Sequence, residues 1–379
     1  MRWHGQRTIA ASDARDCGAG VSGHRRCMKP SPPSATVAFI HGSFRDHRGQ
    51  ASPAGTTMKN ASLCYRSFGP PLDNLELVES DAVSRPEGAL RVAMSLVPVN
   101  PSDLIPVTGA YAHRIALPAV AGYEGVGVVV DASPAYSGLI GRRVLPLRGA
   151  GTWQRFVDCD PRLAVPVPED VGDVVAARGY INPLAATMLL RRWPVRGKRV
   201  LLTAAGSTCA GLLGTWARQD GAAEVNGILR SPGGAARLSA LGIAPVSQND
   251  NRAIDRLADG ADLTFDALGG SLATRILARM KPGSSFVGYG LLSGRPVVPS
   301  RSNRAGLYRF HLRDEIAPMA PAAWQQAFRV LWPRLLRTAL PEVATFPLAQ
   351  WRAAIRHFST PGTGKPLIGF GAADRGSAI

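Results

Sequence analysis

The sequence predicts an α/β protein in which a doubly wound parallel sheet is inserted into a β-rich domain. Three observations support this fold class. The 379-residue chain is too long for one ordinary core and suits two domains. Its first patterned segments alternate and are rich in β-branched residues, as strands are. From about Lys198 strand-like and helix-like segments alternate, which is typical of βαβ units and a parallel sheet.

The β-rich part begins just after Met58, with strand-like segments at 63–79 and 89–100. The parallel-sheet part begins with KRVLLTAAG at 198–206, whose continuous apolar run fits a strand covered on both faces. Helices are expected at 210–222, 235–242 and 272–280, and strands at 225–231, 262–270 and 284–290. The chain ends with an expected helix at 321–337, a strand at 343–348, a helix at 349–357 and a strand at 365–370.

These patterns divide the chain into three regions. Residues 1–57 lack periodicity and contain eight Arg or Lys against three Asp. We expect there a disordered extension, or upstream sequence translated from a misassigned start with Met58 as the true one. An Arg-rich targeting segment is the alternative. The β-rich domain is expected at 58–182 and 320–379, and the parallel-sheet domain at 183–319.

Charge and composition limit the possible partners. The net charge of +17 comes mostly from arginines scattered in ones and twos, without a basic helix or a known nucleic-acid-binding motif. An anionic cofactor and substrate explain such a charge better than nucleic acid does. No apolar run approaches the roughly 20 residues of a membrane span. Five cysteines without a disulfide spacing favour a reducing compartment, and we expect a cytoplasmic protein.

A Gly/Ser turn joins the first strand of the parallel sheet to the following helix. A dinucleotide needs such a tight turn, with the amides of the helix N-terminus aimed at its pyrophosphate. Ala210 takes the place of the usual third glycine and still permits close helix packing. Cys209 lies where a thiol pKa tends to fall, but we do not expect it to act as a nucleophile. The residues expected to cradle the pyrophosphate are Gly206, Ser207, Thr208 and Cys209.

The end of the second strand indicates which dinucleotide binds. NAD-binding units place an acid there for the ribose, whereas this strand ends in Leu229-Arg230-Ser231 with Arg237 shortly after. The guanidinium group presents a planar fork of donors that suits a phosphate. We therefore predict NADPH, with Arg230 and Ser231 binding its 2′-phosphate. The alternative is that Arg230 is an ordinary surface arginine.

The stretch from Val97 to Val130 carries the motifs Asn-Pro-Ser-Asp at 100–103 and Gly-Tyr-Glu-Gly at 122–125. Together with the phosphate-binding turn, they make the chain resemble the medium-chain dehydrogenases/reductases. The resemblance implies a GroES-like catalytic domain with a Rossmann domain inserted into it. It also implies that zinc-dependent members hold Cys and His where this chain has Asn100 and Tyr123. Because neither an amide nor a phenol is a usual zinc ligand, we predict no metal.

Within that family the chain looks most similar to the 2-enoyl thioester reductases of mitochondrial-type fatty acid synthesis. The resemblance runs from about Met58 to Phe370. Tyr111 also suits quinone oxidoreductases, which often keep a tyrosine there. The motifs that carry the likeness are Asn-Pro-Ser-Asp (100–103), Gly-Ala-Tyr (109–111), LPAVAGYEGVG (117–127), Ile-Asn-Pro (181–183), Tyr-Gly (289–290), Phe-His-Leu (310–312) and Lys365.

The resemblance implies a role for several residues. Tyr111 would lie beside the nicotinamide and the thioester, where a phenol can stabilise the developing enolate or supply a proton. A structural tyrosine at the rim is the alternative. Phe310 and Leu312 could equally belong to the core, and Lys365 to a solvated loop. The implied cofactor contacts are Asn182 at the nicotinamide ribose, Tyr289, Gly290, Phe310 and Leu312 at the nicotinamide, and Lys365 from the closing strand.

These features predict an NADPH-dependent reductase that transfers hydride to the β-carbon of an activated alkene, with a 2-enoyl thioester of CoA or an acyl carrier protein as the substrate. An NADPH quinone or enone oxidoreductase and a catalytically idle NADPH-binding protein are the alternatives. The chain departs from the family pattern at two places. These are Ala185 and Thr187, and Asp314-Glu315 after Phe-His-Leu-Arg. Glu124 could be a buried structural acid. Family habit favours a homodimer joined edge to edge through the cofactor domains.

Overall fold

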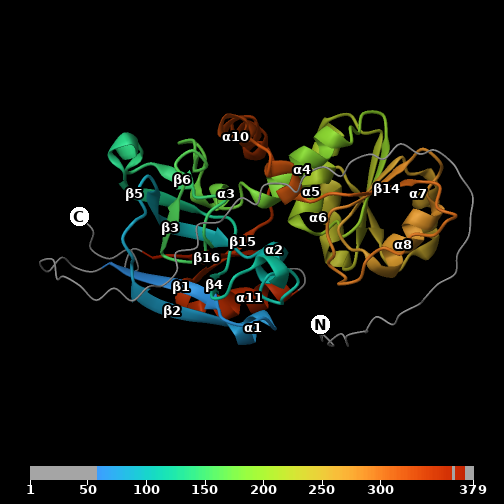
Figure 1. The fold of residues 1–379 in the computed structure, drawn as a ribbon. Helices are drawn as coiled ribbons and strands as arrows, with labels where there is room; N and C mark the ends of the chain where they lie inside the picture. The colour runs from blue at the N-terminus through green and yellow to red at the C-terminus, as the bar shows by residue number, and fades with distance from the viewer. Residues whose placement is uncertain (1–57, 361–362, 372–379) are drawn as a thin grey trace, which may run out of the picture. The chain divides into compact units, whose positions relative to one another are not determined.

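The computed structural model describes residues 58–360 and 363–371, all of which fall within one compact unit. The expected N-terminal extension at 1–57 lies outside the described residues. Three sheets and the helices around them make up the fold (Figure 1). None of the helices in the described part of the chain combines the length and apolar character that a bilayer crossing requires.

The β-rich part contains two mainly antiparallel sheets. In the larger one, strands from the end of the chain lie beside strands from its beginning, since β16 pairs with β3. The smaller sheet has the order β2 (Leu75–Asp81), β1 (Lys59–Tyr65), β4 (Ala119–Val120). The larger has the order β15 (Val343–Pro347), β16 (Lys365–Gly369), β3 (Leu90–Pro98), β5 (Val126–Ala132), β6 (Arg143–Leu145), β8 (Val165–Pro166), with β7 (Phe156–Cys159) also paired to β3.

The third sheet has six strands, and every neighbouring pair in it is parallel. Numbered from its first strand, the order is 3-2-1-4-5-6, the order of a doubly wound dinucleotide-binding sheet. The predicted fold class is therefore confirmed. The order is β11 (Ala244–Ser247), β10 (Glu224–Leu229), β9 (Arg199–Leu202), β12 (Leu263–Asp266), β13 (Ser285–Gly288), β14 (Gly306–Arg309). All six lie inside the expected 183–319 region, whose boundaries stay a prediction.

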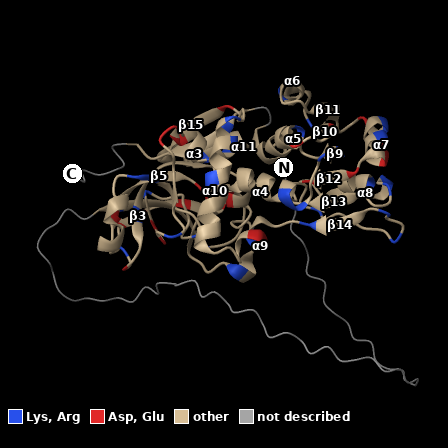
Figure 2. Cartoon of the chain, turned by 90° about the horizontal axis from the view of Figure 1, so that it is seen from above, with Lys and Arg blue, Asp and Glu red and all other residues tan. Residues whose placement is uncertain are grey.

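Helices connect the parallel strands and cover the sheets. Those of the parallel-sheet part are α4 (Ile181–Arg192), α5 (Thr208–Gln219), α6 (Ala235–Ala240), α7 (Asn251–Gly260) and α8 (Gly270–Arg279). The others are α1 (Pro71–Asn74), α2 (Pro101–Leu104), α3 (Asp173–Ala176), α9 (Leu312–Ile316), α10 (Pro321–Leu336) and α11 (Trp351–Ser359). Figure 2 shows their Lys and Arg residues spread over several elements rather than gathered along one helix.

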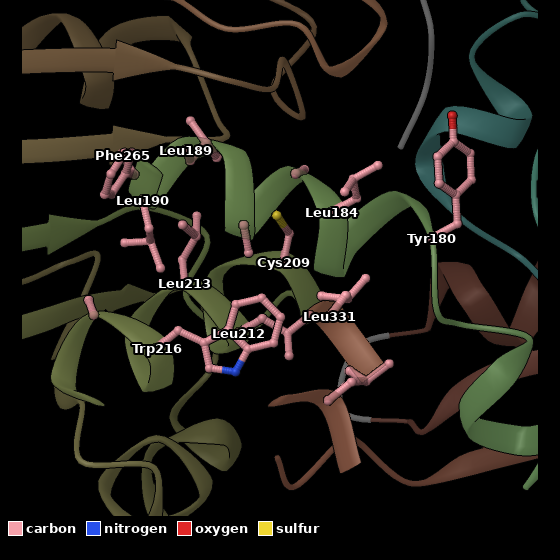
Figure 3. Close-up of a cluster of buried hydrophobic side chains, with 14 of the residues drawn as sticks. Tyr180, Leu184, Leu189, Leu190, Cys209, Leu212, Leu213, Trp216, Phe265 and Leu331 are labelled. Atoms are coloured by element: carbon pink, nitrogen blue, oxygen red, sulfur yellow. The ribbon is translucent and has the colours of Figure 1, made fainter. Parts of the chain in front are cut away.

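The contact between α4 and α5 positions the site. In Figure 3 Leu190 of α4 lies next to Leu213 of α5. The same cluster includes Trp216, also on α5, and Leu331 of α10. Trp216 has no exposed surface, and its Nε1 donates to Thr338 Oγ1 at 2.9 Å. Burying such a large side chain contributes strongly to stability. Leu184 and Cys209, near the starts of α4 and α5, belong to the same cluster, so one shared core holds both helix starts.

Candidate active site

The Asn-Pro-Ser-Asp motif begins α2 at the rim of the site. Asn100 is the N-cap residue and Pro101 follows at the first helical position, where its fixed φ suits a helix. The buried Asp103 carboxylate accepts from Asn100 N at 2.8 Å and from Tyr123 N at 3.0 Å. One carboxylate thus holds together the backbone of the Asn-Pro-Ser-Asp and Gly-Tyr-Glu-Gly motifs.

Glu124 ties the same rim to the start of α4. One of its oxygens accepts from Asn100 Nδ2 at 2.7 Å. The other accepts from Tyr180 N at 3.1 Å and Ile181 N at 2.8 Å, two amides that a helix N-terminus leaves without an intrahelical partner. Only 1% of Glu124 is exposed. These contacts are those of a buried structural acid, which is the role that the sequence suggested for Glu124.

Lys365 and Asn182 complete this group, which we call the buried polar cluster: Asn100, Asp103, Glu124, Asn182 and Lys365. Asn100 Oδ1 accepts from Lys365 Nζ at 2.5 Å and from Asn182 Nδ2 at 3.3 Å. The sequence placed Lys365 and Asn182 at a cofactor, and the structure brings the two together through Asn100. Sequence reasoning missed this role of Asn100 because it considered the residue only as a lost zinc ligand.

Burial dominates the electrostatics of the cluster. It raises the pKa of Asp103 to about 7, helped by the negative charge of Glu124 and opposed by the amide donors and Lys365. Burial likewise raises the pKa of Glu124, against its hydrogen bonds. The pKa of Lys365 falls to about 8, because burial outweighs the attraction of Glu124 and Asp103. The pKa values of Asp103 and Lys365 therefore both lie near neutral pH.

The phosphate-binding turn between β9 and α5 has the geometry that its sequence predicts. Ser207 is the N-cap of the helix, and its side chain accepts from Ala210 N at 3.3 Å. Gly206 is exposed, and its carbonyl accepts from Arg237 Nη2 at 3.1 Å. Ala204 has φ 47°, a left-handed conformation uncommon for a residue with a Cβ. The exposed turn at a helix N-terminus is suited to an anion.

Arg230 and Ser231 follow the last residue of β10 and are both exposed. Arg237 lies on α6 and joins the phosphate-binding turn through its bond to Gly206, with its pKa lowered by burial. No Asp or Glu occupies positions 230–249. A phosphate beyond the end of β10 would therefore meet a cation and a hydroxyl group, with no nearby acid in sequence to repel it.

Tyr289 lies against the start of α5, next to Cys209 and Ser207. Its hydroxyl is buried and makes no hydrogen bond of good geometry. Cys209 Sγ is 3.9 Å from Asn182 O, and burial raises its thiol pKa to about 12. The expected effect of the helix N-terminus on this thiol is therefore outweighed by desolvation. A Cβ at Gly290 would come 2.8 Å from Ala267 O, so only glycine fits there.

Phe310 and Leu312 are placed in the core. Phe310 is 3% exposed and packs edge-on against Trp193 at 6.5 Å between ring centroids. Leu312 begins α9 and is partly buried against the same cluster. This is the alternative that the sequence left open. Their contact with a nicotinamide stays a prediction, and their packing gives each of them a structural role in any case.

Tyr111 lies at the rim, half-buried, with the Arg114 guanidinium 4.3 Å from the centre of its ring. Tyr123 lies within electrostatic reach of Tyr111, Arg114 and Arg313. Burial raises the pKa of Tyr123, and the two arginines oppose the rise. The site thus holds two phenols near two cations. Sequence reasoning considered Tyr123 only as a lost zinc ligand and missed it as a second phenol at the rim, although its place in the Gly-Tyr-Glu-Gly motif gave the signal.

Within the described residues, no three His, Cys, Asp or Glu side chains are grouped so that they could hold a metal ion. The buried polar cluster instead offers two carboxylates, two amides and an ammonium. Its amide and carboxylate groups are engaged with one another and with backbone N–H groups. Its chemistry is therefore that of internal support, and the exposed donors of the site are the phenols at the rim.

Replacing Asp103 should change how stability depends on pH. The folded protein holds this proton up to about pH 7, against an ordinary value of 3.8, so it binds more protons than the unfolded chain in that window. The Asp103 contribution to the free energy of unfolding therefore falls as pH rises from about 4 to 7. We expect a shallower fall in Asp103→Asn, measured by urea unfolding at a series of pH values.

The control is Asp170→Asn, at an exposed aspartate. In this variant the free energy of unfolding should depend on pH as it does in the wild-type protein. Parallel profiles for Asp103→Asn and the wild-type protein would contradict the raised pKa of Asp103.

Comparisons with known proteins agree with this site and fold. Residues 86–169 match the alcohol dehydrogenase GroES-like domain. The chain is 30% identical over 250 residues to the mitochondrial enoyl-[acyl-carrier-protein] reductase of Xenopus tropicalis, covering 62% of this chain and 71% of that protein. A solved structure of a candidate NADPH:quinone reductase from Bacillus thuringiensis has 32% identity and a TM-score of 0.76, covering 83% of this chain and 99% of that one.

A solved Etr1p complex with NADP and crotonyl-CoA has a TM-score of 0.72 at 18% identity, covering 83% of this chain and all of that one, and shows the fold alone. The GroES-like match falls in the β-rich part, and the doubly wound sheet follows it in the chain. The identities to the Xenopus and Bacillus proteins extend over most of each relative. The chain therefore belongs to the medium-chain dehydrogenase/reductase family of oxidoreductases.

Proposed function

We propose that the protein is an NADPH-dependent reductase of activated alkenes and that its substrates are 2-enoyl thioesters. The observation that carries the proposal is that the Asn100 side chain is fully engaged in hydrogen bonds within the protein. Its amide binds Lys365, Asn182 and Glu124 and has no free polar atom to offer a substrate carbonyl. The donor then comes from the two phenols at the rim, Tyr111 and Tyr123, of which the resemblance assigns Tyr111 to the substrate. Curated relatives named as enoyl reductases support the substrate class.

The residues present fit the dinucleotide. The exposed Gly206 lies in the turn just before a 12-residue helix, whose N-terminal amides suit a pyrophosphate. Arg230 and Ser231 would hold the 2′-phosphate, and Asn182 would contact the nicotinamide ribose. The Arg guanidinium is suited to such a phosphate by its planar set of donors. Bound NADPH supplies a hydride.

Tyr111 performs the other half of the reduction in this proposal. When hydride reaches the β-carbon, the π electrons of the alkene move onto the thioester and leave enolate charge on its oxygen. A phenol hydrogen bond stabilises that charge, and proton transfer to the α-carbon completes the saturated product. Zinc serves as the Lewis acid for a substrate oxygen in alcohol dehydrogenases. In this proposal the Tyr111 hydroxyl stabilises the substrate oxygen in place of a metal ion.

The surroundings of Tyr111 favour a carrier that bears phosphate. His113, Arg114 and Arg313 are exposed, and none of the three forms an ion pair among the described residues. Cationic side chains at the entrance attract a phosphopantetheine carrier. A quinone or enone substrate would not need them. The identity to the Bacillus thuringiensis protein keeps a quinone reductase as the second candidate.

Assembly and location are part of the same proposal. β14 is an edge strand of the parallel sheet, and its Leu307 and Tyr308 are each 44% exposed. An exposed apolar edge strand is a surface that a second strand can cover. We propose a homodimer formed through this edge, which light scattering would detect. Three described cysteines are free thiols, in keeping with a cytoplasmic location, which fractionation would test.

The proposed substrate is tested by following NADPH oxidation with a crotonyl thioester and with a simple quinone, in parallel. We expect faster turnover of the thioester, because its carbonyl can accept from Tyr111 while its carrier meets the cationic entrance. Turnover of the quinone alone would contradict the proposal and select the second candidate. Bound NADPH without turnover of either compound would indicate an idle binding protein.

Tyr111→Phe should lower kcat for the thioester by about 10²-fold, the loss typical of one such donor. The dissociation constant of NADPH should stay unchanged, because the phenol acts on the substrate. Steady-state kinetics and a fluorescence titration of NADPH measure the two quantities. Tyr136→Phe, at a half-buried position in a 3₁₀ helix of the β-rich part, is the matched control. An unchanged rate in Tyr111→Phe would remove this residue from the mechanism.

Arg230→Gln should raise KM for NADPH by about tenfold and leave KM for NADH nearly unchanged. A charge-assisted hydrogen bond contributes about 1.5–3 kcal/mol, and a tenfold change corresponds to about 1.4 kcal/mol. Arg252→Gln, an exposed arginine on α7, serves as the control. Equal losses with the two cofactors would show that Arg230 does not recognise the 2′-phosphate.

A further inference from the structure

The resemblance implies that Lys365 contacts the cofactor, whereas in the structure its ammonium group contacts Asn100. Lys365 begins β16, and its Nζ donates to Asn100 Oδ1 at 2.5 Å. The same oxygen accepts from Asn182 Nδ2, while Asn100 Nδ2 donates to Glu124. Every polar atom of the Asn100 carboxamide is therefore occupied. The orientation of this amide is fixed, because a flip would turn its NH₂ group toward two other donors, Lys365 Nζ and Asn182 Nδ2.

Lys365 also supplies the positive charge of the buried polar cluster. Asp103 and Glu124 are each 1% exposed, and buried carboxylates are costly without a compensating charge. Arg178 lies within electrostatic reach of Glu124 but donates to the carbonyls of Val174 and Pro341. Among the described residues, Lys365 is the cation that bonds directly to the cluster.

We propose that Lys365 is a positioning residue: it neutralises the two buried carboxylates and, through Asn100, holds the Asn182 carboxamide in place for the nicotinamide ribose. The second part rests on the proposed function, since it assumes that Asn182 meets the cofactor. The first part concerns the protein without any ligand. Lys365 therefore acts on the cofactor through two intervening side chains and not by contact.

The neighbours of Lys365 set the electrostatics of this arrangement. Asp103 on α2 and Glu124 before β5 attract its charge, and Arg178 repels it. On α11, the Phe358 ring lies 5.7 Å from Nζ, and His357 Nε2 lies 3.0 Å from Gly364 O, next to Lys365 in the chain. Removing the ammonium would leave Asp103 and Glu124 without compensation above the pH at which they ionise.

The first experiment uses the ligand-free protein. We expect Lys365→Met to lower Tm more at pH 7.5 than at pH 6, because Asp103 ionises between these values while the wild-type Lys365 is still protonated. The double variant Asp103→Asn/Lys365→Met should recover part of the loss at pH 7.5. Lys281→Met, which removes a partly exposed ion pair with Asp262 and a hydrogen bond to Gly260 O, is the control and should show no such pH dependence. Equal losses at the two pH values would overturn the charge-neutralising role.

The second experiment is a double-mutant cycle on NADPH binding, measured by fluorescence titration. We expect Lys365→Met and Asn100→Ala each to raise Kd by about tenfold, the loss of one charged hydrogen bond. The double variant should bind no more than about twofold more weakly than the worse single variant, since both act through one path. A loss equal to the product, about 100-fold, would indicate direct contact between Lys365 and the cofactor and overturn the positioning role.

The two experiments separate this inference from the proposed function. A wild-type protein that binds no NADPH would contradict the proposed function, and with it the role of Asn182. The Tm measurements would still decide the charge-neutralising role. Lys365→Arg keeps the positive charge but changes the donor geometry, so it should retain the Tm at pH 7.5 while weakening NADPH binding. A loss of Tm in Lys365→Arg as large as in Lys365→Met would contradict a role for the charge.

Discussion

Two buried carboxylates hold together the segments on which the site depends. Asp103 binds the backbone of Asn100 and Tyr123, and Glu124 binds the backbone at the start of α4. Because the amides at a helix N-terminus carry positive charge, a carboxylate there is favourable. The rim of the β-rich part and the helix that leads to the parallel sheet are thus joined by hydrogen bonds to charged groups, which are stronger than those between neutral groups.

This link places the reaction chemistry relative to the cofactor turn. α4 carries Asn182 in its first turn and packs along α5, whose first turn is the phosphate-binding turn. Cys209 at the start of α5 contacts the carbonyl of Asn182, so the two helix starts touch directly. The close packing of the core resists relative movement of the two helices. The phenols at the rim and the turn proposed to bind the pyrophosphate are therefore joined by one rigid connection.

The sequence predicted the features that are local in the chain. Alternating strands and helices predicted the doubly wound sheet, and the Gly/Ser turn predicted the start of α5. Contacts between distant segments were not predictable in the same way. Lys365 and Asn100 are 265 residues apart, and nothing in their local pattern indicates a hydrogen bond. Phe310 could have been core or cofactor wall, since both require an apolar side chain. Only the tertiary structure shows the neighbour, Trp193, that it packs against.

The central claim is that hydride reaches the β-carbon of an enoyl thioester and that a proton then reaches its α-carbon. NADPH deuterated at the transferable position, a crotonyl thioester and the protein in ordinary water test this claim directly. The proposal predicts a butyryl product with deuterium at the β-carbon and ordinary hydrogen at the α-carbon, as NMR would show. Deuterium at the α-carbon or the carbonyl carbon, or no transfer to the thioester at all, would contradict it.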